Sequence, residues 1–143
     1  MRPAYRRPGK SRWLLLSAAV VFLIPAGLAA GCSSQPSYCA AATNLKTSVS
    51  NLSNVDVSKN GLSSLQTALN SVQSNAKTFA SEAKSAYPSQ TTALQNSLSS
   101  LENAITSAKG QPPLNAAAAV APAVTQVKTS ASAVQSAASG ACQ

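Results

Sequence analysis

The sequence predicts an all-α domain over residues 38–143 from the pattern of its apolar side chains. Apolar residues recur in this region at alternating spacings of three and four, which places each set on one side of a helix. No stretch alternates between apolar and polar residues for long enough to indicate a β-strand. Turn-forming residues interrupt the pattern at three places and divide it into four apolar runs.

The first two runs predict two helices that are joined by a turn at residues 56–61. Ser58, Asn60 and Gly61 in this segment favour a turn followed by a helix start. The first run consists of Ala42, Leu45, Val49 and Leu52. The second run consists of Leu62, Leu65, Leu69, Val72, Ala76, Phe79, Ala83 and Ala86.

A proline ends the second run and introduces the third. Tyr87 precedes Pro88, and the residue before a proline is disfavoured in the helical conformation. The third run consists of Leu94, Leu98, Leu101, Ile105 and Ala108. Gly110 and residues 112–113, both prolines, are expected to end it.

The fourth run predicts a helix with an irregular beginning. Asn115 is expected to cap this helix. Pro122 lies inside the run, so the helix either kinks there or begins its regular part near Ala121 with Pro122 in the first turn. The run consists of Val120, Val124, Val127, Ala131, Val134, Ala138 and Ala141.

Residues 1–31 have the organisation of a secretory leader. Residues 1–12 carry five basic side chains and no acid, and residues 13–24 are apolar except for Ser17. Pro25 and Gly27 then precede a stretch of small residues, an order typical of a signal peptide. The alternative is a membrane span, but residues 13–30 reach only the lower edge of the roughly 17–25 residues that a spanning helix needs. We therefore expect a cleaved leader.

The end of this leader, Leu28-Ala29-Ala30-Gly31-Cys32, resembles the lipobox of bacterial lipoproteins. The resemblance implies that a lipid is attached to the thiol of Cys32 and that the leader is cut just before it. Residues 32–37 would then be the lipidated start and a short tether. Ala29 stands where the family most often has leucine, and cleavage by ordinary signal peptidase would instead give a secreted protein. The expected location is the extracytoplasmic face of the cell membrane.

If Cys32 is acylated, Cys39 and Cys142 remain as a pair. Export would place them where a disulfide persists, and two free thiols are the alternative. Closing a loop of about 100 residues contributes up to roughly 4–5 kcal/mol in the chain-entropy model. The predicted core consists largely of alanine and valine, with Phe79 as its one large aromatic side chain. Such a bridge would compensate for the small stabilisation that this core provides.

The same pair decides the expected number of helices. One long helix over residues 62–108 would be about 70 Å long and would leave the ends of the flanking helices far apart. A disulfide needs its two Cα atoms within about 7 Å, and an even number of antiparallel helices returns the chain to its starting end. We therefore expect an antiparallel up-down-up-down four-helix bundle closed by an end-to-end disulfide.

The charges do not indicate a nucleic-acid partner. The formal net charge is +8, but five of the eleven basic residues lie in the leader. The remaining six are lysines that are scattered singly, and Lys77 and Lys84 on the second run are expected to be rim charges beside the core. Nucleic-acid binding usually requires a clustered basic stripe with arginine or aromatic groups.

The sequence also supplies little for catalysis. It contains no histidine, and Asp56, Glu82 and Glu102 belong to three separate predicted elements. No metal-ligand cluster, phosphate-binding loop or activated serine can be recognised. We expect no enzymatic activity, no cofactor and no metal.

Residues 38–142 resemble the small Ala-rich helical domains of actinobacterial exported proteins and lipoproteins. The matching features are Tyr38-Cys39, Val55-Asp56-Val57 and Gly140-Ala141-Cys142. No activity is assigned to this group, so the resemblance implies location and architecture alone. We expect a non-enzymatic envelope lipoprotein that acts as an interaction or structural module and has the membrane and an envelope protein as partners. The alternative is a carrier or chaperone for a lipid or other apolar ligand, because Ala-lined helices can leave a cavity.

Overall fold

A computed structural model describes residues 35–83 and 85–143, and these residues form four helices and no strand. The expected leader and Cys32 lie outside the described residues. The helices are α1 (Tyr38–Ser53), α2 (Val57–Ala83), α3 (Pro88–Ala108) and α4 (Pro113–Ser139). The prediction of an all-α fold with four helices is confirmed.

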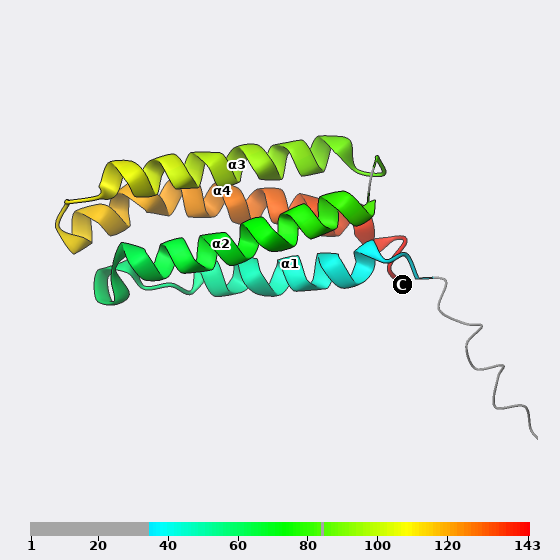
Figure 1. The fold of residues 1–143 in the computed structure, drawn as a ribbon, viewed down its shortest axis with the longest axis horizontal. Coiled ribbons are helices and arrows are strands. Elements are labelled where there is room, and N and C mark those ends of the chain that lie inside the picture. Colours follow the sequence, from blue (N-terminus) through cyan, green and yellow to red (C-terminus); the bar gives the residue numbers. More distant parts are fainter. Residues whose placement is uncertain (1–34, 84) are drawn as a thin grey trace, which may run out of the picture. The chain divides into compact units, whose positions relative to one another are not determined.

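The four helices lie side by side and form a bundle (Figure 1). The α1–α2 and α3–α4 connections lie at one end, which we call the distal end. The α2–α3 connection, the start of α1 and the end of α4 lie at the other end, which we call the disulfide end. Helices α2 and α4 contact each other across the bundle, whereas α1 and α3 make no contact in the part of the chain that is described.

Two of the predicted breaks fall where the backbone leaves the helical conformation. Tyr87 has φ −134°, and α3 begins at the following Pro88. Gly110 lies between α3 and α4 with φ 82°, a left-handed conformation that glycine adopts without steric cost. Gly110 therefore follows the end of α3 as the sequence predicts, whereas α2 ends at Ala83, before Tyr87, and Pro88 begins α3.

The turn predicted at residues 56–61 is itself partly helical. Residues 57–60 form a first turn, and the helical geometry is then interrupted at Gly61, which has φ 76° and ψ 173°. Val57 in this turn is buried in the core. The sequence gives the position of the break, but Val57 belongs to no apolar run, so the short turn before the break was not predicted.

The expected start of α4 was wrong. The helix begins at Pro113 rather than after a cap at Asn115, and it continues through Pro122. Proline is well suited to the first helical turn, where its missing N–H would have no partner inside the helix. A regular helix starting near Ala121 is therefore ruled out. Ala116 and Val120 are buried before Pro122, and their packing keeps the first part of α4 helical despite the hydrogen bond lost at the proline.

The buried side chains form one core cluster along the inside of the bundle. Every member of the first and third runs is buried, as predicted. Ala86 and Ala141 are exposed, because α2 ends at Ala83 and α4 ends at Ser139, so the helical spacing does not extend to them. Ala116 and Ala123 belong to the core but were missing from the predicted fourth run.

Candidate functional site

The disulfide end is held by a bond between Cys39 and Cys142, as predicted. Their Cα atoms are 5.5 Å apart, although the two residues are separated by 103 positions in the sequence. Cys39 lies in the first turn of α1 and is 6% exposed, whereas Cys142 follows α4 and is half-buried. The bridge therefore fixes the start of the first helix to the segment after the last one.

A hydrogen bond adds a second link at the same place. The Gln35 Nε2 atom donates to the backbone carbonyl of Cys142 over 2.7 Å. The segment before α1 is thus attached to the C-terminal segment as well as to its own helix. The predicted lipidation residue Cys32 lies outside the described residues but is three residues from Gln35, a reach of about 10 Å for an extended chain.

Three aromatic side chains meet at the disulfide end. The ring of Tyr38 meets those of Phe79 and Tyr87 edge-on, with centroid distances of 6.1 and 5.5 Å. The Phe79 and Tyr87 rings are stacked at 6.2 Å. Sequence analysis identified Phe79 alone as a large core aromatic and missed this cluster. The arrangement of the helices brings these residues together, because the start of α1, the end of α2 and the residue before α3 all lie at the disulfide end of the bundle.

The two tyrosine hydroxyls of this cluster are 3.3 Å apart and share a hydrogen bond. The hydrogen bond with Tyr87 and partial burial both favour the neutral form of Tyr38 and raise the pKa of its hydroxyl. A phenol with a raised pKa stays protonated near neutral pH. The cluster therefore joins three elements.

Asp56 is used for helix capping at the distal end. Its carboxylate accepts hydrogen bonds from the Ser58 hydroxyl and from the Lys59 backbone N–H, and it lies 3.2 Å from the Lys59 ammonium nitrogen. The Ser58 hydrogen bond, followed by those from Lys59, lowers the pKa of this carboxyl. These contacts stabilise the first turn of α2.

The two glutamates of the bundle do not converge. Glu102 Oε2 accepts a hydrogen bond from Gln73 Nε2 across the α2–α3 interface, at 3.4 Å. Glu82 is nine residues further along α2 than Gln73, which corresponds to about 14 Å along the helix axis. The structure therefore brings no carboxylate pair together at this interface.

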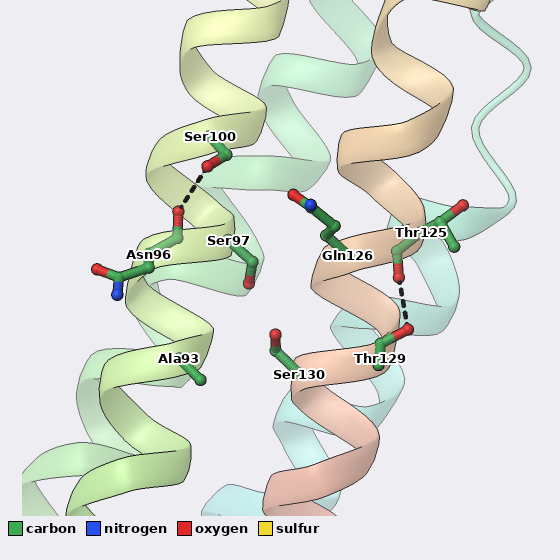
Figure 2. Close-up of a pocket in the computed structure, with 8 residues that line it drawn as sticks. All are labelled: Ala93, Asn96, Ser97, Ser100, Thr125, Gln126, Thr129 and Ser130. Atoms are coloured by element: carbon green, nitrogen blue, oxygen red, sulfur yellow. Dashed lines mark hydrogen bonds between the residues drawn. The ribbon is translucent and has the colours of Figure 1, made fainter.

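The largest described groove lies at the surface between α3 and α4 (Figure 2). Its volume is about 490 Å³, and hydroxyl and amide side chains from both helices line it. Ser100 and Thr129 donate to the backbone carbonyls of Asn96 and Thr125 over 3.0 Å, so these hydroxyls are bonded to their own helices. The groove has a polar wall without a charged or strongly nucleophilic group.

Two smaller grooves lie between other pairs of helices. One has a volume of about 310 Å³ between α2 and α3 and includes Lys77, Leu98 and Glu102. The other has a volume of about 160 Å³ next to the disulfide, between α1 and α4, and includes Lys46. Lys77 is exposed at the rim of its groove, as predicted, and the side chain of Lys84 is outside the described part of the structure.

The buried polar side chains of the described residues are hydrogen-bonded within the protein. Ser48 and Ser97 are buried, and their hydroxyls donate to the carbonyls of Leu45 and Leu94 in their own helices. No buried side-chain nitrogen or oxygen in the described segments lacks a hydrogen-bond partner.

Within residues 35–83 and 85–143, no group of three or more potential metal ligands comes together. None of the four described helices combines the length and hydropathy needed to cross a bilayer.

Comparison with known proteins gives no relative on which to base a function. The sequence matches no protein-family model, no curated protein and no solved structure. The functional argument therefore depends on the residues and geometry of this chain.

Proposed function

We propose that this chain is a non-enzymatic cell-envelope lipoprotein, anchored through Cys32, whose helical domain is an interaction or structural module at the outer face of a membrane. The observation that carries the proposal is the disulfide between Cys39 and Cys142. It uses two of the three cysteines and leaves Cys32, at the end of the basic and apolar leader, as the third. A disulfide also fits a protein that is exported to an oxidising compartment.

The proposed architecture is an antiparallel up-down-up-down bundle. The alternating positions of the three connections and the link between the two ends of the domain support this topology. In this arrangement Gln35, which precedes the first helix, and the C-terminal segment lie at one end. The helix surfaces and the distal end remain available to another envelope protein.

The distribution of polar groups supports a binding role rather than catalysis. Asp56 caps a helix, Glu102 bonds to Gln73, and Glu82 is displaced from both along the bundle. Four of the five hydroxyl side chains that line the largest groove donate to backbone carbonyls of their own helices; they are those of Ser97, Ser100, Thr125 and Thr129. General acid–base or nucleophilic catalysis requires such groups to converge on one position.

The carrier alternative receives less support. A carrier for a lipid needs an apolar cavity that encloses much of its ligand. The grooves described above lie at the surface between helices, and the largest is lined mainly by serine, threonine and amide side chains. The core side chains behind them are buried against one another.

Intact mass of the protein extracted from the membranes of a bacterial host tests the lipoprotein proposal. We expect loss of residues 1–31, added acyl mass on Cys32, and a gain of about 2 Da on reduction of the single bridge. The matched variant Cys32→Ala removes the predicted acylation thiol while the disulfide remains. We expect this variant to lose the acyl mass and to leave the membrane fraction. A native protein without acyl mass would contradict the proposal.

A further inference from the structure

We propose that the disulfide end of the bundle is a lipid-contact surface that rests against phospholipid headgroups, with the distal end directed away from the bilayer. The surface is formed by residues 35–37, 85–87 and 140–143. The inference rests on the lipid anchor proposed above and adds an orientation and a contact surface to it.

The first support is the short distance between the anchor and the bundle. Gln35 is hydrogen-bonded to the Cys142 carbonyl at the disulfide end, and residues 33 and 34 alone separate it from Cys32. An extended chain of three residues reaches about 10 Å. A lipid on Cys32 would therefore keep the disulfide end within about 10 Å of the membrane surface, so that the anchor has little freedom to move the bundle away.

The second support is the composition of the surface. The side chains of residues 35–37, 85–87 and 140–143 are uncharged, and Ser85, Ala86 and Ala141 are exposed. An uncharged surface loses little hydration energy when it contacts headgroups, in contrast to a surface that carries isolated charges. Tyr87 is half-buried at the disulfide end and adds the type of amphipathic ring that favours the membrane–water interface.

Charged residues are more numerous around the connections of the distal end than in the α2–α3 connection, where Lys84 is the one charged residue in the sequence. Asp56, Lys59 and Lys109 all lie in or next to its two connections. Helix α4 has 27 residues, so its first turn at the distal end is about 40 Å from the disulfide end. This end also contains Leu114, which is 75% exposed. Leu114 is therefore the alternative apolar site through which the bundle would contact a membrane.

Two tryptophan variants of the full-length protein distinguish these ends. Ala86→Trp places an indole in the exposed α2–α3 connection, and Leu114→Trp is the matched exposed position at the distal end. The native chain has one tryptophan, Trp13, which leaves with the leader. Each processed variant thus reports from one position. The proteins are reconstituted into phosphatidylcholine–phosphatidylglycerol vesicles that contain a lipid with a nitroxide-labelled headgroup.

We expect the nitroxide to reduce the fluorescence severalfold more at position 86 than at position 114. Equal quenching at the two positions would indicate a bundle that lies flat, and stronger quenching at position 114 would indicate contact through Leu114; either result overturns the proposed surface. Circular dichroism and the mass change on reduction check that both variants are folded and bridged. Intact mass and vesicle flotation report the anchor separately. If the protein is acylated and floats with the vesicles but shows the wrong quenching pattern, the proposed lipid-contact surface is contradicted and the lipoprotein proposal is not. If the protein carries no acyl mass, both the lipoprotein proposal and the proposed surface are contradicted.

Discussion

Leu101 and Leu114 show how the same side chain has different roles in this bundle. Leu101 on α3 is fully buried in the core, and Leu114 in the first turn of α4 is 75% exposed. Because much of the core is alanine and valine, each large buried side chain accounts for a substantial share of the apolar area removed from water. Stability should therefore depend strongly on a few leucines and on Phe79.

Truncation of these two leucines should separate the effects of burial from those of residue type. We expect Leu101→Ala to lower the free energy of unfolding by about 2–5 kcal/mol, through lost burial and a residual cavity. Leu114→Ala should change it by less than about 0.5 kcal/mol, because the side chain already contacts water. Urea unfolding followed by circular dichroism measures both values. Equal losses would indicate that Leu114 is covered in solution.

At the scale of the elements, two glycines near helix ends differ in the backbone conformation that they adopt. Gly61 has φ 76° and ψ 173°, a conformation that is available almost exclusively to glycine. Gly140, after α4, has φ −64° and ψ −28°, which any residue can adopt. A Cβ atom added at either position would meet no other atom within 4 Å. The two glycines therefore differ in backbone conformation and not in available space.

This difference predicts opposite tolerance of alanine. Gly61→Ala should lower the free energy of unfolding by about 1–3 kcal/mol, because alanine is strained at this φ and ψ. Gly140→Ala is the matched control and should remain within about 0.5 kcal/mol of the native protein. Chemical denaturation of the two variants under identical conditions gives the comparison. A neutral Gly61→Ala would show that the α1–α2 connection adopts another conformation in solution.

The apolar periodicity was sufficient to predict the four helices but not their ends. Pro88 and Gly110 are strong local signals, and the helices break beside them as predicted. The start of α4 at Pro113 was missed because two good initiators, Pro113 and Asn115, lie close together in the sequence. Ala116 and Ala123 were missed because alanine is compatible with either face of a helix, and tertiary packing determined that these two are buried.

At the scale of the whole molecule, one covalent bond joins the two ends of the helical domain. The Cys39–Cys142 pairing could be predicted because three cysteines and a lipobox-like leader left one plausible pair. The aromatic cluster beside it could not be read from spacing, because Tyr38, Phe79 and Tyr87 come from three distant segments. Their proximity depends on the relative placement of whole helices.

Removal of the bridge should destabilise the entire bundle. The double variant Cys39→Ser/Cys142→Ser should lower the free energy of unfolding by about 3–5 kcal/mol, because the unfolded chain regains the entropy of an open loop. Reduction of the native bridge should give a similar loss. Both are measured by denaturant unfolding in a Cys32→Ala background, which removes the third thiol as an exchange partner. An unchanged midpoint after reduction would contradict this role.

The bridge also determines how the domain responds to mechanical force. A load applied between the segment before α1, which we propose is anchored, and the segment after α4 enters at Cys39 and leaves at Cys142, which are directly bonded. The covalent bond carries the tension, so the helices between the two cysteines are not pulled apart. The oxidised domain would transmit a pull to the proposed membrane anchor without unfolding, whereas in the reduced domain the same tension would run through the helices.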